Sequence, residues 1–270
     1  MKKALTIAGS DSGGGAGIQA DIKTFQELGV YGMTAITAVT AQNTRGVQAV
    51  SPVDQTLVEA QIDSIASDIG ADAVKTGMLF SSDIIKAVSK KIKLYKWEKV
   101  IVDPVMVAKG GHTLLQLEAV EALKKHLLPL SLLATPNIPE AEVLTGLSIH
   151  TLHDKKEAAR RIIDLGVKNA VIKGGHEGNS TESIDLLFDG TSFEQFPGLR
   201  IATKNTHGTG CTFSASITAE IAKGKELKEA VQTAKQFIGA AIREALDIGS
   251  GHGPTNHWAH RKGANYVRFS

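Results

Sequence analysis

Cysteine is nearly absent from this chain, because Cys211 is the only one among 270 residues. A single cysteine cannot form a disulfide within the chain, which excludes the disulfide-rich folds of small secreted proteins. Long apolar runs are lacking too, and none approaches the length of a membrane-spanning helix. The first apolar run stops at Gly9 and is too short for a signal peptide, so we read it as a strand. We therefore expect a cytoplasmic protein that has no membrane partner.

The chain also lacks a large excess of positive or negative charge. The 30 Lys and Arg residues balance 28 Asp and Glu residues, which leaves a formal net charge of +2. No basic stripe with interleaved aromatic residues occurs, so nucleic acid is not an expected partner. The sequence also has no linker rich in Pro, Gly and Ser, and its length suits one large α/β domain. We expect a single domain over residues 1–270.

Short β-branched runs alternate with amphipathic segments along the chain. Strands are expected at residues 4–8, 34–41, 73–76, 99–103, 132–135, 170–173 and 184–188. Helices are expected at residues 17–28, 55–69, 82–94, 117–128, 155–165, 210–222 and 226–246, with a hairpin-like stretch near 190–201. This alternation predicts an α/β fold with a mostly parallel sheet covered by helices on both faces. Ligands of such sheets bind beyond the carboxyl ends of the strands, where polar residues gather in this sequence.

A first glycine loop, at residues 13–17, follows a strand and opens a helix. Gly15, Gly17 and Ala20 fit the G-x-G-x-x-A form of the dinucleotide fingerprint. That fingerprint also requires an acid at the end of the second strand, where this chain has Gln42 and Asn43. A nicotinamide enzyme is therefore the weaker interpretation. Either the loop is a flexible turn, or its glycines let backbone N–H groups and Asp21 approach a small ligand.

A second glycine loop leads into a late helix at residues 205–212. No P-loop motif occurs in the chain, so an ATP-dependent enzyme must hold its phosphates elsewhere. Gly208, Thr209 and Gly210 can aim several N–H groups at one anion, and the helix dipole adds positive charge there. Cys211 lies in the first turn, where thiol pKa values fall. The alternative is a glycine-rich helix start with a buried, inert cysteine.

A thiol enzyme with His207 as the base of Cys211 is a further alternative. It is weak, because nothing in the sequence fixes the His207 ring or orients it. Two carboxylates favour metal chemistry instead: Asp103 ends a strand before a proline, and Glu140 lies three residues after Asn137. Mg²⁺ on nucleotide phosphates needs only one or two carboxylates. Alternatively, Asp103 is a turn residue and Glu140 is an acid that caps a helix.

Eight segments together resemble the hydroxymethylpyrimidine/phosphomethylpyrimidine kinase family of thiamine biosynthesis, within the ribokinase-like superfamily. They are TIAGSDS at 6–12, GAGIQAD at 15–21, AVTAQNT at 38–44, VKTGML at 74–79, VDPVM at 102–106, TPNIPE at 135–140, HGTGCT at 207–212 and GHGP at 251–254. The resemblance covers nearly the whole chain. It implies a ribokinase-like three-layer α/β/α sandwich with a mostly parallel central sheet, a small β flap and a homodimer.

The resemblance also implies site roles. Gly208, Thr209 and Gly210 would form the anion hole, and Cys211 would be the base or a proton relay, where the superfamily more commonly has Asp. The substrate would be contacted by Gly9, Asp21, Gln42 and Met78. Asn137, Lys173, Thr209 and Lys235 would lie by ATP, and Asp103 and Glu140 would serve Mg²⁺.

The implied reaction is phosphorylation of 4-amino-5-hydroxymethyl-2-methylpyrimidine and then of its monophosphate, to the diphosphate. Two alternatives remain. One is a pyridoxal or pyridoxine kinase of the same family, although residues 41–44 read differently in that branch. The other is a non-catalytic protein that binds a nucleotide or a vitamer.

Overall fold

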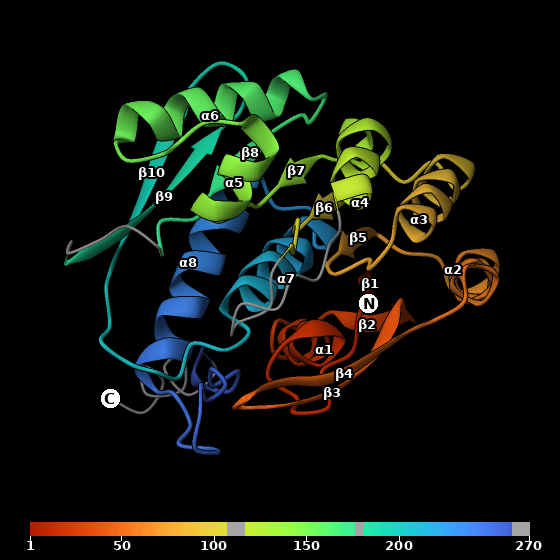
Figure 1. Ribbon diagram of the computed structural model, residues 1–270, viewed down its shortest axis with the longest axis horizontal. Coiled ribbons are helices and arrows are strands. Elements are labelled where there is room, and N and C mark those ends of the chain that lie inside the picture. The colour runs from red at the N-terminus through yellow and green to blue at the C-terminus, as the bar shows by residue number, and fades with distance from the viewer. Residues whose placement is uncertain (107–116, 176–180, 261–270) are drawn as a thin grey trace.

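The protein is built on one eight-stranded sheet, seen in the computed structural model of Figure 1, in which residues 1–106, 117–175 and 181–260 are described. Six strands are parallel: β1 (Lys3–Ala8), β2 (Tyr31–Ile36), β5 (Ala73–Thr76), β6 (Val100–Val102), β7 (Leu133–Ala134) and β8 (Ala170–Ile172). Two antiparallel strands extend one edge: β9 (Glu182–Phe188) and β10 (Phe193–Leu199). The order across the sheet is β10-β9-β8-β7-β6-β5-β1-β2. The expected mostly parallel sheet is confirmed.

Helices cover both faces of the sheet and bury two separate hydrophobic cores (Figure 1). One face carries α1 (Gly17–Glu27), α7 (Thr209–Ala222) and α8 (Leu227–Arg243). The other face carries α2 (Gln55–Asp68), α3 (Ser82–Leu94), α4 (Leu117–Ala122), α5 (Ile138–Thr145) and α6 (Leu152–Asp164). The central strands are buried on both sides, because alternate side chains enter opposite cores. The three-layer α/β/α sandwich is thus confirmed.

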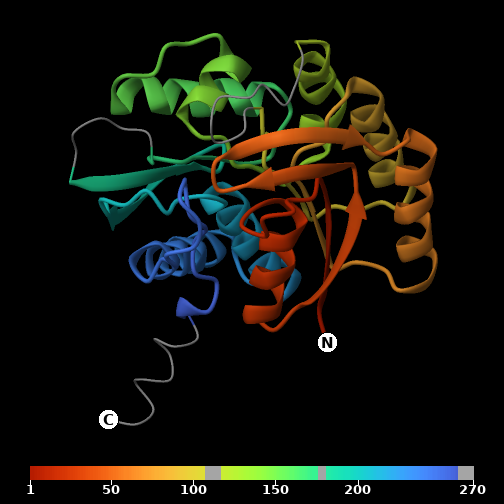
Figure 2. The same cartoon turned by 60° about the horizontal axis from the view of Figure 1, so that its bottom comes forward.

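A separate two-stranded antiparallel sheet, the flap, consists of β3 (Ala38–Asn43) and β4 (Gly46–Pro52). Figure 2 shows it standing apart from the main sheet. The single strand expected at 34–41 is therefore wrong. The chain turns out of the sheet at Thr37, whose N–H donates to Ala8 O and whose hydroxyl donates to Met78 O. These bonds anchor the flap above the carboxyl ends of β1 and β5.

The other predicted helices and strands occur near their expected positions, with one further exception. The helix expected at 117–128 stays α-helical only through Ala122, continues as a π-helical turn over Leu123–Leu127 and ends in a 3₁₀ turn over Leu128–Leu130. Pro129 lies in that 3₁₀ turn, where its missing N–H could not continue an α-helix. The short helix α5 begins after Asn137, with Pro139 in its first turn, where a missing N–H is tolerated.

Candidate active site

The two glycine loops meet at the carboxyl edge of the sheet. Gly208 caps the start of α7 with a φ of 82°, and a Cβ at this position would collide with the carbonyl oxygen of Gly15. Both the left-handed backbone and the close approach require glycine here. A Cβ on Gly15 would in turn lie 2.6 Å from the Cδ2 atom of His207. Two segments that are far apart in the sequence therefore form one continuous wall.

The segment predicted to bind an anion, Gly208–Cys211 (the anion loop), forms the start of α7. The first N–H groups of a helix have no acceptor within the helix, and the dipole makes this end partly positive. The position of a Cβ on Gly210 would lie 3.3 Å from Lys173 Nζ and 3.7 Å from Asp103 Oδ2. The structure therefore places the anion loop directly against Lys173, which follows β8, and Asp103, which follows β6. Such a combination can hold phosphate oxygens.

Asp103 is buried beyond the end of β6 and is surrounded by donors. Its Oδ1 accepts from Lys173 Nζ at 2.8 Å, and its Oδ2 accepts from the Ser214 hydroxyl at 3.2 Å. Burial alone would raise the pKa of Asp103, but the charges of Lys173 and Lys75 hold it below its usual range. Asp103 is therefore ionised, and its carboxylate links the end of β6 to Lys173, which follows β8, and to Ser214 of α7.

Glu140 caps helix α5, which is one of the two roles that its sequence context allowed. It forms a capping box with Asn137: Asn137 N–H donates to Glu140 Oε2 at 2.8 Å, and Glu140 N–H donates to Asn137 Oδ1 at 2.9 Å. The same Glu140 Oε2 lies 3.9 Å from Lys173 Nζ. Burial raises the pKa of Glu140 to about 7. Lys173 therefore sits between the two carboxylates that were expected to serve Mg²⁺.

The donor set suits a magnesium ion that arrives with its nucleotide. Among residues 1–106, 117–175 and 181–260, no group of three or more His, Cys, Asp and Glu side chains could hold a metal by itself. Mg²⁺ typically takes one or two protein carboxylates and completes its shell with phosphate and water oxygens. Asp103 and Glu140, next to the anion loop, fit that requirement.

Cys211 is half-buried in the first turn of α7. The expectation of a lowered thiol pKa is wrong, because burial raises the pKa of Cys211 to about 11. The ammonium of Lys75 and the backbone N–H of Gly17 act in the opposite direction but do not outweigh burial. Cys211 is therefore a thiol at rest and not a preformed thiolate.

Asp21 is fully buried next to the site. Its side chain is 0% exposed, both carboxylate oxygens lie 2.8 Å from Lys75 Nζ, and Oδ2 also accepts from the Thr6 hydroxyl at 2.6 Å. This buried ion pair joins α1 to β5, and the expected contact between Asp21 and a substrate stays a prediction. Sequence reasoning missed Lys75, although a lysine in the apolar strand β5 was the available signal.

The other expected substrate contacts lie close together. Gly9 directly follows β1 and donates its N–H to Met78 O, and a Cβ on Gly9 would collide with Met78 Cε. Gln42 is half-buried on β3 of the flap. Its amide lies 3.4 Å from His207 Nε2, and that ring is held by Asp11 Oδ2 at 2.7 Å. The view that nothing fixes His207 is therefore wrong, and Asp11 is a site residue that sequence reasoning missed.

Lys235 was also expected to lie by the nucleotide, but its described contacts are with strand β9. Its Nζ donates to Asp185 Oδ2 at 2.9 Å and to Ser183 O at 2.7 Å, which ties α8 to β9. Asp185 Oδ1 also accepts from Gly174 N–H at 2.8 Å, one residue after Lys173. Lys235 thus belongs to the support of the Lys173 turn and has no described contact with the anion loop.

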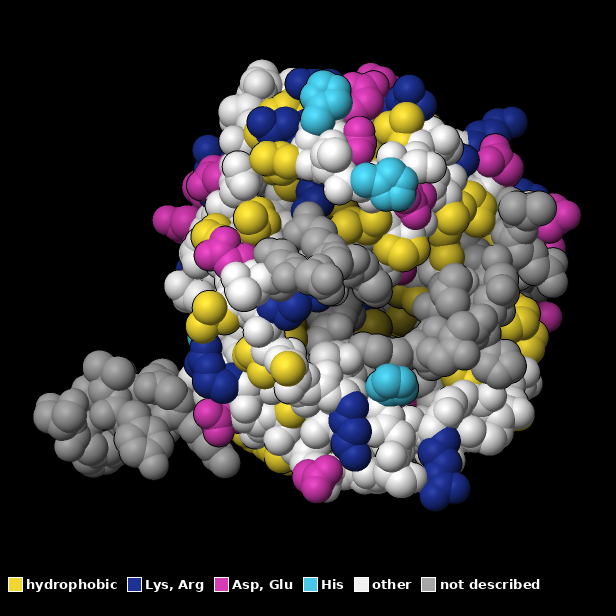
Figure 3. Space-filling model, turned by 60° about the vertical axis from the view of Figure 1, so that its left-hand side comes forward, with side chains coloured by type: hydrophobic (Ala, Val, Ile, Leu, Met, Phe, Trp, Pro, Cys, Tyr) yellow, Lys and Arg dark blue, Asp and Glu magenta, His cyan; other side chains and the backbone are white. Residues whose placement is uncertain are grey.

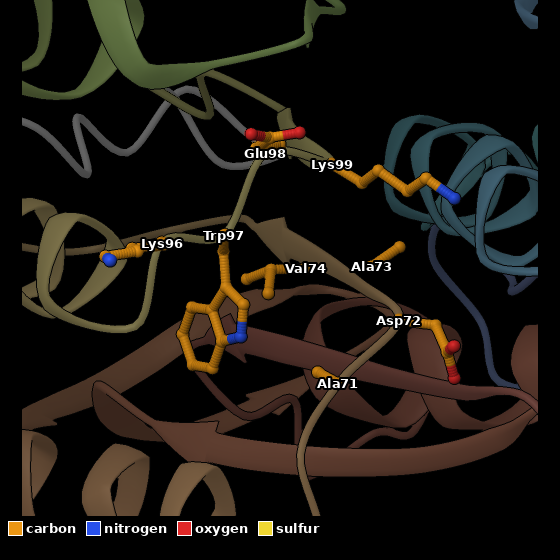
Figure 4. Close-up of a pocket in the computed structure, with 8 residues that line it drawn as sticks. All are labelled: Ala71, Asp72, Ala73, Val74, Lys96, Trp97, Glu98 and Lys99. Carbon is orange, nitrogen blue, oxygen red and sulfur yellow. The ribbon is translucent and has the colours of Figure 1, made fainter.

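One face of the molecule is hollowed, and hydrophobic, basic and histidine side chains border the hollow (Figure 3). A separate cavity of about 230 Å³ lies at the amino-terminal edge of β5 and β6, lined by Ala71–Val74 and Lys96–Lys99. Its lysines point apart, with Lys99 directed towards α7, so they do not converge on an anion (Figure 4). None of the site residues lines this cavity, so the geometry of the carboxyl edge identifies the site better than cavity size does.

None of the described helices is long and apolar enough to cross a membrane.

The protein family described as phosphomethylpyrimidine kinase matches residues 11–256.

Similar proteins extend over nearly the full chain. A hydroxymethylpyrimidine/phosphomethylpyrimidine kinase from Bacillus subtilis is 55% identical over 260 residues, covering 96% of each chain. A pyridoxine kinase from the same organism is 48% identical and covers 97% of each chain. The crystal structure of an ADP complex of Bacillus subtilis pyridoxal kinase superposes with a TM-score of 0.90 at 46% identity, over 97% of this chain and 99% of that one. The chain belongs to the phosphomethylpyrimidine kinase family.

Proposed function

We propose that this protein is an ATP-dependent kinase that phosphorylates 4-amino-5-hydroxymethyl-2-methylpyrimidine and then its monophosphate, in thiamine biosynthesis. The observation that carries the proposal is the convergence of the anion loop, Lys173 and Asp103 at one edge of the sheet. The flap residue Gln42 and Met78 lie at the same edge. Phosphates and a small ring can therefore be held side by side.

In this reaction the substrate hydroxyl oxygen forms a bond to the γ-phosphorus of ATP, and the bond to ADP breaks. The anion loop would stabilise charge on the transferred group, with Lys173, Thr209 and Asn137 on the nucleotide side and Lys235 supporting Lys173. Cys211 would act as a proton relay, because it is a thiol at rest: Sγ takes the hydroxyl proton as its own proton moves to a phosphoryl oxygen. The monophosphate would then react in the same site.

The test is an assay of ADP formation with ATP, Mg²⁺ and hydroxymethylpyrimidine, with the mono- and diphosphate products separated. Pyridoxal serves as the parallel substrate, because pyridoxine kinase is the second candidate function and a 48% identical relative carries that name. Higher kcat/KM for the pyrimidine supports the proposal. Higher kcat/KM for pyridoxal favours the second candidate, and no turnover of either ring indicates a non-catalytic binding protein.

Mg²⁺ would be held by Asp103 and Glu140, where it would neutralise charge on the ATP phosphates. The Glu140→Gln variant should raise the Mg²⁺ concentration for half-maximal rate severalfold, because a neutral amide attracts a hydrated cation less. The amide oxygen can still accept from Asn137 N–H, so the α5 cap and the melting temperature should change little. An unchanged Mg²⁺ titration would leave Glu140 with its capping role alone.

Gln42 would read the aminopyrimidine ring, since its amide offers one acceptor and a donor group to a ring that carries the complementary pair. Gln42→Leu should lower kcat/KM for hydroxymethylpyrimidine by about ten- to a hundredfold, because a polar group left unpaired costs about 1–3 kcal/mol. Pyridoxal, which lacks the aminopyrimidine edge, should lose less. Steady-state kinetics on both substrates measure this, and equal losses would show that Gln42 supports the pocket without reading the ring.

We further propose a single domain, a homodimer and a cytoplasmic location. The continuous sheet supports the single domain, and the homodimer and the location rest on the family resemblance. Sedimentation of the purified protein measures the assembly state, and a monomer at assay concentration would reject the dimer.

A further inference from the structure

The segment GHGP at 251–254 carries part of the family resemblance, but the mechanism proposed above gives it no role. It lies within residues 249–257, which we call the strap, an irregular stretch of chain after α8. Hydrogen bonds join the strap both to the turn of the flap and to the start of α7. The strap therefore connects the ring side of the candidate site, which carries Gln42, with the phosphate side, which carries the anion loop.

One part of the strap is bound to the turn of the flap. The carbonyl oxygen of Thr44 accepts from His252 N–H at 2.7 Å, and its hydroxyl oxygen accepts from Gly251 N–H at 3.2 Å. Arg45 Nε donates to the Ser250 hydroxyl at 2.8 Å. A Cβ on Gly251 would collide with Thr44 O. The strap and the flap turn are therefore in direct backbone contact.

The next residues of the strap are bound around the anion loop. His207 N–H donates to Gly253 O at 3.0 Å, and Thr255 N–H donates to His207 O at 3.3 Å. Further along the strap, His257 Nε2 lies 3.0 Å from the Thr212 hydroxyl, and both of these residues are buried. Because His207 directly precedes the anion loop and Thr212 directly follows it, the strap holds the loop at both of its ends.

The two sets of contacts begin on adjacent residues. His252 is bound to the flap turn and Gly253 to His207, and consecutive Cα atoms lie only about 3.8 Å apart. The flap turn and the start of α7 therefore cannot slide past each other without breaking one set of bonds. Transfer of a phosphoryl group is sensitive to such a shift, because misplacing the reacting atoms by about 1 Å can lower the rate about 10²-fold.

We propose that the strap positions the substrate ring against the γ-phosphate of ATP, by fixing the flap turn relative to both ends of the anion loop. This inference rests on the proposed function. The strap acts through Thr44, His207 and Thr212, so its residues are positioning residues. Binding of either ligand depends mainly on one half of the site, whereas the transfer step depends on the alignment of both halves. A strap variant should therefore bind each ligand normally and transfer the phosphoryl group slowly.

Gly251→Ala tests the strap directly, because its methyl group would push the flap turn away from the strap. Gly251 is not among the glycines with positive φ, so the backbone itself accepts alanine. The single-turnover rate with saturating ATP, Mg²⁺ and hydroxymethylpyrimidine should fall about 10- to 100-fold. Calorimetric affinities for hydroxymethylpyrimidine alone and for a non-hydrolysable ATP analogue alone should stay within about threefold, because the groups that contact each ligand are kept.

Two further variants make the experiment independent of how well Gly251→Ala folds. Thr44→Val keeps the side-chain shape and the carbonyl bond to His252 but removes the hydroxyl that accepts from Gly251 N–H. It should lower the transfer rate about two- to tenfold, the cost of one hydrogen bond, with both affinities kept. Gly239→Ala is the matched control, because a Cβ on this residue of α8 would meet no atom within 4 Å. It should transfer at the wild-type rate.

The rate is expressed per folded molecule, so that a loss of stability is not counted as slow transfer. Wild-type rates in both Gly251→Ala and Thr44→Val would overturn this inference and leave the proposed function standing. A loss of ring affinity with a wild-type rate at saturation would also overturn it, because the strap would then support the flap alone. A loss confined to the affinity for the ATP analogue would equally limit it to the anion loop. No transfer to the pyrimidine by wild type would overturn both proposals.

Discussion

Replacing Cys211 by alanine should lower kcat about 10²–10⁴-fold, which is the usual contribution of a positioned proton-transfer group. KM for ATP should stay within about twofold, because the anion loop holds phosphates through backbone N–H groups that the substitution keeps. The loss should therefore fall on the chemical step. Single-turnover measurements with saturating ATP and Mg²⁺ separate this step from binding and product release.

Two companion variants sharpen the Cys211 experiment. Cys211→Ser keeps a group of similar size that can pass a proton, so its rate should lie between those of wild type and Cys211→Ala. Cys211→Asp introduces the acid that is commoner in the superfamily and should retain activity if the half-buried position accepts a carboxylate. Turnover of Cys211→Ala near the wild-type rate would reject the relay and leave the thiol as a packing group.

Lys75→Met should reduce the free energy of unfolding by about 3–5 kcal/mol, because it leaves the buried Asp21 carboxylate without its partner. Both side chains of this pair are 0% exposed, and the charge of Asp21 raises the pKa of Lys75 above its usual range although burial opposes it. Burial also raises the pKa of Asp21, although Lys75 and the Thr6 hydroxyl oppose that shift, so the two 2.8 Å contacts are the direct evidence for the pair. Urea unfolding followed by circular dichroism measures the change.

A matched surface pair provides the control for Lys75. Lys86 and Asp83 form an ion pair at 3.5 Å with side chains 55% and 71% exposed, so Lys86→Met should change the stability by less than about 0.5 kcal/mol. Replacing both Lys75 and Asp21 by apolar residues should recover much of the single-variant loss. A loss below about 1 kcal/mol for Lys75→Met would mean that Asp21 protonates or finds another donor at little cost.

Local signals explain how much of the fold could be predicted. Helix α3 occurs at the predicted bounds because Ser81 caps its first turn, Asp83 follows, and Lys91 and Lys93 lie in its last turn. The break at Thr37 could not be predicted in this way. It depends on a hydrogen bond from the Thr37 hydroxyl to Met78 O, which lies 41 residues further along the chain.

The candidate site, like the fold, was predictable only where local sequence signals determine it. The anion loop and the position of Asp103 follow from glycine spacing and from the end of a strand. The Asp11–His207 and Asp21–Lys75 contacts join residues 196 and 54 positions apart, and no local pattern encodes them. The thiol pKa of Cys211 was predicted with the wrong sign because the helix start was visible in the sequence and the burial was not.

The contact between Gly208 and the first glycine loop has a consequence for how the enzyme is made. Residues near both ends of the chain build one wall, and the His207 backbone is also held by Gly253 and Thr255. Because proteins are synthesised from the N-terminus, a nascent chain still on the ribosome carries the flap and Gln42 long before it carries the predicted anion loop. On the proposed function, phosphoryl transfer can begin only after residues 207–256 have been synthesised, so unfinished chains would not consume ATP.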